Sequence, residues 1–181
     1  MGKTSLEAFS DGVLAIILTI MVLEMKVPQG YDISSLKPLM PVFLSFILSF
    51  IHICIYWNNH HHLFNVVQKI NGKALWANNH LLFWLSLFPF ATGWMGENHF
   101  STWAVAIYGF VLMMAGIAYY ILVRVLVHQD INNTRLSKAV GKDNKGMISV
   151  IIYISAIPLC LLHPYIACSL YRSCFNLAYT R

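Results

Sequence analysis

Long apolar segments separated by short polar ones run through the whole chain. A helix needs about 20 mostly apolar residues to cross a hydrocarbon core of roughly 30 Å, and the first four segments reach that length. Two further segments near the C-terminus are shorter. The pattern predicts six transmembrane helices, over residues 6–25, 39–63, 75–95, 102–127, 147–162 and 165–179.

Residues that interrupt helices fill the breaks between these segments. They are Pro28 with Gly30, Pro38 with Pro41, Asn71 with Gly72, residues 96–98, residues 129–145 and His163 with Pro164. Because proline lacks a backbone donor, Pro89 and Pro158 predict kinks in the third and fifth segments.

Composition agrees with a membrane protein. Hydrophobic residues make up 58% of the 181 residues and charged residues 10%, whereas soluble domains average about 25% charged residues. Six spans leave no room for a soluble domain, so residues 1–181 are expected to form one all-α, polytopic domain in a lipid bilayer. The net charge of +5 does not indicate nucleic-acid binding, because the basic residues lie at segment ends and form no single patch.

The basic residues predict the orientation of the chain, because cytoplasmic loops retain Lys and Arg. Only Lys26 and Lys37 lie outside when the N-terminus is placed inside. The cytoplasmic side then receives Lys3, Lys69, Lys73, Arg124, Arg135, Lys138, Lys142, Lys145, Arg172 and Arg181. Both termini are therefore expected in the cytoplasm.

One stripe of the first segment has two possible roles. Helical spacing places Gly12, Ile16, Thr19 and Leu23 on the same face. Such a face often packs against a neighbouring helix, and the Thr19 hydroxyl then bonds back to its own helix. Alternatively, several copies of the helix surround a pore, with Ile16 and Leu23 as apolar constrictions that gate ions by dewetting. Glu24 at the mouth then concentrates cations, or is simply a solvated helix end.

Asp11 lies inside the first segment, where an ionised side chain costs roughly 2.5–3.5 kcal/mol at the membrane centre. Side chains that could stabilise it occur in the second and third segments: Trp57, Asn59, His60, His61 and His80. We interpret them as an interhelical polar network at the cytoplasmic membrane edge. A metal site is the alternative, but a catalytic site needs about three ligands at one point, and the histidines show no recurring ligand spacing. No metal is therefore expected.

The start of the first segment resembles a known family. Phe9-Ser10-Asp11-Gly12, followed by an Ile/Leu/Thr helix that ends in Val22-Leu23-Glu24, is similar to the signature of the prokaryotic transmembrane protein 175 family. Its members are bacterial and archaeal relatives of the lysosomal and endosomal potassium channel. Residues 57–62 and 78–80 look like the second and third spans of that family, and the layout is similar along nearly the whole chain.

The resemblance implies a potassium-selective leak channel in the bacterial plasma membrane. It implies a homotetramer whose pore is lined by the first helix of each subunit, with potassium as the permeant ion and no cofactor. The family's hydrophobic constriction falls on Ile16, the threonine that contributes to selectivity on Thr19, and the next apolar layer on Leu23. Like the family, the chain lacks the TVGYG filter of ordinary potassium channels.

The chain departs from the family at Ser5, where the family usually has an arginine four residues before the signature phenylalanine. The expected partner of Asp11 is therefore missing, or is replaced by one of His60, His61 and His80.

Three other functions fit the same residues. In a proton- or cation-coupled transporter, Asp11 and the histidines form a relay, although we find no inverted repeats. A small membrane metalloenzyme would use His60, His61, His62 and His80. A scaffold that conducts nothing is the third. No ATP-binding motif is found, so the sequence favours a passive channel without catalysis.

Overall fold

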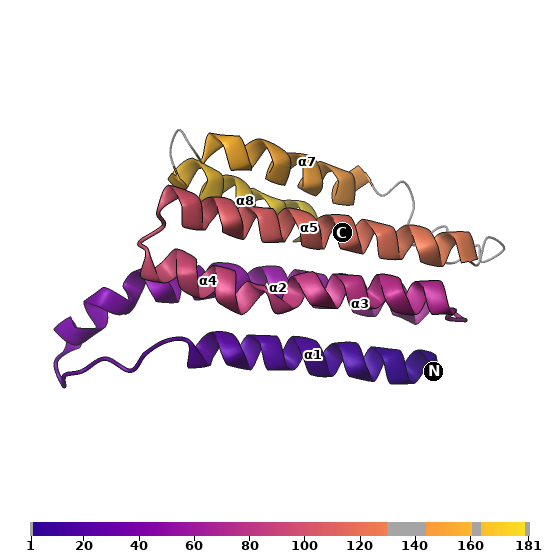
Figure 1. The fold of residues 1–181 in the computed structure, drawn as a ribbon, viewed down its shortest axis with the longest axis horizontal. Helices are drawn as coiled ribbons and strands as arrows, with labels where there is room; N and C mark the ends of the chain where they lie inside the picture. The colour runs from indigo at the N-terminus through magenta and orange to yellow at the C-terminus, as the bar shows by residue number, and fades with distance from the viewer. Residues whose placement is uncertain (1, 130–143, 161–163, 180–181) are drawn as a thin grey trace.

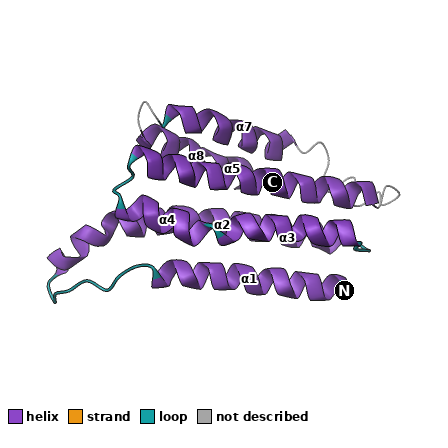
Figure 2. Ribbon diagram, in the orientation of Figure 1, coloured by secondary structure: helices purple, strands orange, loops and turns teal. Residues whose placement is uncertain are grey.

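The computed structural model describes residues 2–129, 144–160 and 164–179, and all regular elements there are helices (Figures 1 and 2). In chain order they are α1 (Lys3–Leu23), the 3-10 helix η1 (Ile33–Leu39), α2 (Met40–Val66), α3 (Gly72–Ser86), α4 (Phe88–Glu97), α5 (Thr102–Gln129), α7 (Asn144–Leu159) and α8 (Pro164–Tyr179). The predicted all-α fold is confirmed.

The third predicted segment is divided into two helices that run nearly end to end (Figure 1). The division falls at Leu87, whose amide bonds the carbonyl of Trp84 at 3.3 Å in a tightened last turn of α3. Pro89 lies in the first turn of α4, where no helical hydrogen bond is required of its nitrogen. A kink is predicted at Pro89; the structure instead ends α3 at Ser86 and begins a new helix at Phe88. Pro158 lies one residue from the end of α7, and the kink expected there stays a prediction.

Three helical stretches of the described chain are long and apolar enough to cross a membrane: α1, η1 with α2, and α5. Helices α3 and α4 are each too short alone, and together they cover residues 72–97. The helix axes run roughly along one direction, and the start of α1 and the end of α8 point to the same end of the bundle (Figure 1). This arrangement agrees with membrane insertion, while the count of six spans stays a prediction.

Helix α5 forms the centre of the bundle and packs against α3, α4, α7 and α8. Small residues on its buried faces let these neighbours approach closely; among them are Ala104, Gly109, Ala115 and Ala118. A side chain at Gly109 would collide with the Tyr171 ring of α8. The core is therefore built around α5, and α1 lies at one edge of the bundle, against α2, α3 and α4 (Figure 1).

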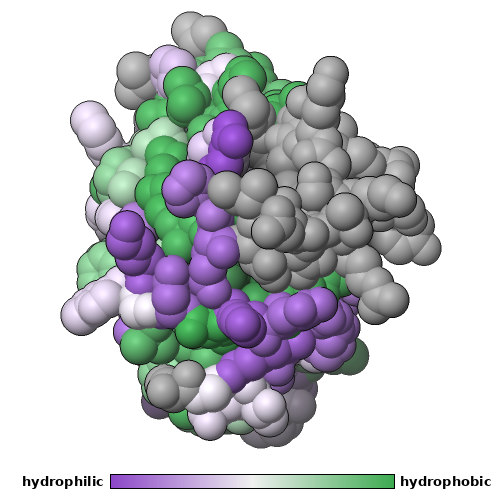
Figure 3. Space-filling view, turned by 90° about the vertical axis from the view of Figure 1, so that its right-hand side faces the viewer, coloured by the Kyte–Doolittle hydropathy of each residue, from purple (hydrophilic) through white to green (hydrophobic). Residues whose placement is uncertain are grey.

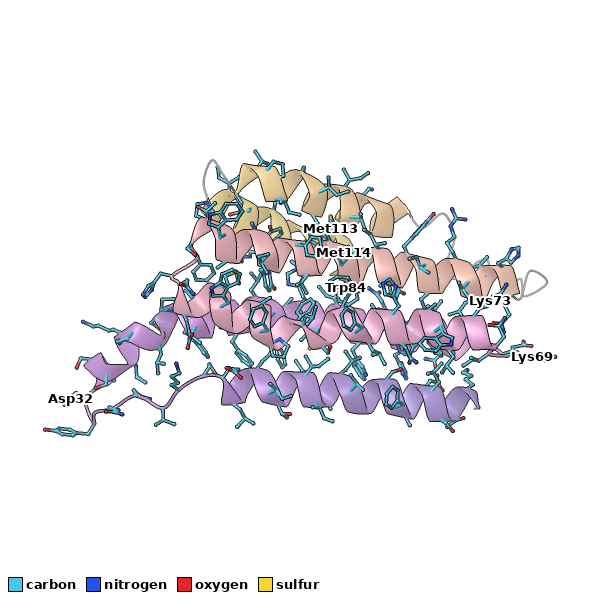
Figure 4. All side chains as sticks on the ribbon, in the orientation of Figure 1. Asp32, Lys69, Lys73, Trp84, Met113 and Met114 are labelled. Carbon is cyan, nitrogen blue, oxygen red and sulfur yellow. The ribbon has the colours of Figure 1, made fainter. Side chains whose placement is uncertain are left out.

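The two ends of the bundle differ in charge. Lys69 and Lys73 lie at the end where α1 begins, and Asp32 lies at the opposite end (Figure 4). Seen end on, the face where α1 begins shows hydrophilic side chains across its middle, with hydrophobic surface above and between them (Figure 3). At the Asp32 end, Lys26 and Glu97 form an ion pair of 2.7 Å that ties the loop after α1 to the end of α4. The hydrogen bond and the charge of Glu97 raise the pKa of Lys26.

Candidate functional site

Helix α1 buries one face and leaves the opposite face uncovered. The buried residues follow a spacing of three or four, which is one side of a helix: Leu6, Ser10, Leu14, Ile17 and Met21. This buried face is turned toward α2, α3 and α4, the helices on which α1 packs.

On the uncovered face lie Gly12, Ile16, Thr19 and Leu23, which we call the open stripe. Ile16 is 58% exposed and Leu23 79% exposed. A side chain added at Gly12 would meet nothing within 4 Å. At about 100° per residue, the open stripe is turned roughly half a circle from the buried face. The helices described here therefore pack on the other side of α1, and the stripe is free to contact something outside this chain.

The Thr19 hydroxyl on this stripe is held by its own helix. It donates to the carbonyl of Ile16 at 2.8 Å. A hydroxyl has one hydrogen and two lone pairs, so the oxygen of Thr19 keeps acceptor capacity on the uncovered side. Glu24, the residue that follows α1, is also exposed.

A chain of three hydrogen bonds, which we call the inner support, fixes the buried face of α1 near its start. Ser10 donates to the Leu6 carbonyl at 2.8 Å and accepts from the Asn78 amide nitrogen at 3.0 Å. The Asn78 oxygen lies 2.8 Å from Nε2 of His60, which therefore donates. Ser10 and Asn78 are fully buried and His60 is 2% exposed. The support joins α1, α2 and α3 at one depth.

Asp11 has a separate partner beside the inner support. The indole nitrogen of Trp57 donates to its carboxylate at 3.0 Å, and the Trp57 ring stacks on His61 with centroids 5.8 Å apart. The predicted contact between α2 and Asp11 is therefore present, and the donor is tryptophan. Neither a histidine nor Ser5, which is exposed, makes this bond.

Two predicted members of the network bond elsewhere. His80 accepts at Nε2 from the indole nitrogen of Trp84 on its own helix at 3.0 Å. The Asn59 carbonyl accepts from the Tyr119 hydroxyl of α5 at 3.2 Å. The His80 bond therefore lies within α3, and the backbone carbonyl of Asn59 joins α2 to α5; neither bond belongs to the inner support. Phe9, the first residue of the signature, is 51% exposed on α1.

A second polar cluster, the outer support, joins α2, α4 and α5 beside the other end of α1 and was not predicted. Thr92 of α4 donates to Ser49 of α2 at 2.6 Å, and its hydroxyl lies 3.9 Å from the sulfur of Met21. Ser49 donates to the Tyr108 hydroxyl of α5 at 3.1 Å. These residues are at most 4% exposed. The only sequence signal for them is hydroxyl groups within apolar segments, which also occur at positions of no special role.

Across the described residues, no group of three or more His, Cys, Asp or Glu lies close enough to hold a metal ion. In that part of the chain, His60 is hydrogen-bonded to Asn78 and His80 to Trp84.

Comparisons with known proteins agree with the resemblance drawn from the signature. The model of the family described as endosomal/lysosomal potassium channel TMEM175 matches residues 5–89. A potassium channel of a Chryseobacterium species is 54% identical over 171 residues, which cover 94% of this chain and 89% of that protein. A potassium channel of Chamaesiphon minutus is 41% identical over 98 residues, covering 51% of this chain and 48% of that protein.

One solved structure has the same fold. It is the crystal structure of a lysosomal potassium-selective channel TMEM175 homologue from Chamaesiphon minutus, with a TM-score of 0.82 and 29% sequence identity, and it covers 97% of this chain and 94% of that one. The resemblance inferred from the sequence is confirmed, and the chain belongs to the TMEM175 potassium channel family.

Proposed function

We propose that this protein conducts potassium passively across a bacterial plasma membrane, as a homotetramer whose pore is lined by α1. It belongs to a family of membrane channels, which are not enzymes. The observation that carries the proposal is the open stripe: an apolar helix face, opposite the packed face, that this chain leaves uncovered. Both termini lie in the cytoplasm in this arrangement, and no cofactor is required.

In the proposed pore, four copies of the open stripe face a common axis. Ile16 forms the hydrophobic constriction, where a narrow apolar ring opposes the passage of a hydrated ion. Thr19 lies one turn further, and because its hydrogen is given to Ile16, its oxygen offers lone pairs to the cation. Leu23 forms a second apolar layer, and Glu24 at the mouth raises the local cation concentration.

The proton-coupled transporter is the second candidate, and the hydrogen bonds of the described residues argue against it. A relay needs groups that accept and release protons in turn. Asp11 is bonded to an indole, and His60 to an amide, and neither partner passes protons on. Potassium current without a pH-coupled flux would separate the two candidates.

The test is the reversal potential of the purified protein in planar bilayers, with opposing gradients of potassium and sodium across the membrane. We expect a wild-type potential near the potassium equilibrium value. Ile16→Asn wets the constriction, so conductance should rise and the potential should move toward zero. Ile151→Asn is the matched control, because Ile151 of α7 is 60% exposed and Ile16 is 58% exposed. Equal behaviour of the two variants would remove α1 from the pore.

Thr19→Ala tests the hydroxyl separately. It should reduce the preference for potassium with a smaller effect on conductance, and Thr19→Ser, which keeps the hydroxyl, should retain most of the preference. An unchanged reversal potential in Thr19→Ala would contradict a role for this oxygen.

A further inference from the structure

A groove lies between α3 and α5, at the end of the bundle where α3 begins. Its volume is about 840 Å³, within the range of roughly 300–1,000 Å³ typical of ligand sites. Its walls are mainly apolar and include Lys73, Trp76, Ala77 and His80 of α3, and Ile121 and Val125 of α5. We call this feature the α3–α5 groove.

The end of the α3–α5 groove where α3 begins, which we call its mouth, differs in chemistry from the rest of the groove. Trp76 is 75% exposed and Ile121 38% exposed, so the groove offers bare apolar surface to its surroundings. Lys73 stands at the mouth, at the same end of the bundle as Lys69 (Figure 4). His128 is exposed one turn beyond Val125 on the same face of α5. None of the described lining residues is acidic.

We propose that the α3–α5 groove binds an anionic phospholipid, with an acyl chain along the apolar wall and the phosphate at Lys73. Basic pockets between membrane helices on the cytoplasmic side attract anionic headgroups, and tryptophan favours the interface between hydrocarbon and headgroups. Trp76 follows Lys73 by one turn, so the charged group and the aromatic ring are stacked along the helix in the order of a lipid's headgroup and chain.

Charge favours an anionic lipid as the occupant, because a phosphate neutralises Lys73 and the described lining residues include no carboxylate that could do so. The groove lies on α3, and the helix presents Asn78 to α1 and Trp76 to the groove, so this site is separate from the open stripe.

The test uses the purified full-length protein and brominated phosphatidylglycerol, which quenches nearby tryptophans, with brominated phosphatidylcholine of the same chains as the neutral probe. Brominated phosphatidylglycerol should quench the tryptophan fluorescence at lower concentration than brominated phosphatidylcholine. Trp76→Phe should remove the part of the quenching that occurs at low phosphatidylglycerol concentration. Trp103→Phe should retain it, because Trp103 is 72% exposed but lies at the other end of α5. Lys73→Gln should weaken the affinity for phosphatidylglycerol about fivefold, equivalent to roughly 1 kcal/mol for one lysine at the surface.

Lys37→Gln is the matched charge control, since Lys37 is an exposed lysine of η1 and should leave the affinity unchanged. Equal quenching by the two lipids, or full affinity in Lys73→Gln, would overturn the proposal. Spontaneous cross-linking of Trp76→Cys between subunits, without a quenching component from Trp76, would assign the groove to a second copy and would equally overturn it. The readout is binding, so these outcomes do not depend on whether the protein conducts potassium.

Discussion

Replacing Asn78 by alanine should destabilise the protein far more than the loss of one surface amide. Asn78 is fully buried and makes two interhelical hydrogen bonds, to Ser10 and to His60. Interhelical bonds in membrane proteins contribute about 0.6 kcal/mol on average, so two contribute about 1.2 kcal/mol. The variant also leaves the His60 donor buried without its partner, which costs about 1–3 kcal/mol. The expected loss is therefore about 2–4 kcal/mol in the free energy of unfolding.

The assay is reversible unfolding in mixed micelles with an increasing fraction of denaturing detergent, followed by tryptophan fluorescence. Asn79→Ala is the control, because it makes the same chemical change at the next, partly exposed residue and should cost much less. A double-mutant cycle with Ser10→Ala isolates the contact between α1 and α3. We expect a coupling energy of about 0.6–1.7 kcal/mol.

Two results would refute this account of α1. Additive effects of Ser10→Ala and Asn78→Ala would show that the 3.0 Å contact between them contributes nothing. Equal losses in Asn78→Ala and Asn79→Ala would mean that the inner support has no special part in stability. In either case, the orientation of α1 would have to be explained by apolar packing alone.

Three further predictions concern the packing of α4 on α2, the hydrogen bond to Asp11 and the ion pair in the loop after α1. Gly96→Ala should destabilise the protein by about 1–3 kcal/mol, because a Cβ there would lie 2.7 Å from Cα of Val42 and 2.5 Å from Oγ of Ser45. Gly93→Ala is the control: a Cβ there would have no atom within 4 Å, so this variant should be neutral or stabilising in the same unfolding assay. Trp57→Phe should reduce potassium current more than His61→Ala in bilayer recordings, because only Trp57 donates to Asp11. The ion pair of Lys26 should stabilise the fold below pH 10.5, the ordinary pKa of lysine, and this stabilisation should be lost as the pH rises through the raised pKa of Lys26. The effect is small because both side chains are exposed. Lys26→Gln should abolish this loss of stability at alkaline pH in thermal unfolding.

Helical periodicity was sufficient to predict the open stripe, because residues three and four apart must share a face of α1 whatever surrounds it. The spacing did not reveal which face would be packed. The buried face carries Ser10, a polar residue, while the uncovered one carries Ile16 and Leu23. In a soluble protein the uncovered face would be polar, but in a membrane an apolar face can meet lipid or another subunit, and a polar side chain must find its partner inside the bundle.

The partners within the polar network could not be derived from the sequence. Asn78, Asn79 and His80 are consecutive, and only their rotation about α3 decides that Asn78 meets Ser10 while His80 turns to Trp84. The outer support is a stronger example, since Ser49, Thr92 and Tyr108 come from three helices whose relative depth no local pattern encodes. Sequence reasoning therefore located the polar layer at the start of α1 and missed the one near its end.

The two supports together explain how the proposed pore keeps its lining. Ser10 is hydrogen-bonded to Asn78 near the start of α1, and the Met21 sulfur lies against Thr92 near its end, so the hydrogen bond fixes the rotation of the helix and the second contact agrees with it. A change of one residue in register would turn α1 by about 100° and carry Ile16 and Thr19 away from the axis. Apolar contacts alone discriminate weakly between such rotations, because leucine and isoleucine occur on every side of α1, whereas an unpaired Asn78 inside the membrane opposes each of the wrong ones. In the proposed pore, the residues that face the ion are thus determined on the far side of the helix, by groups that do not line the pore.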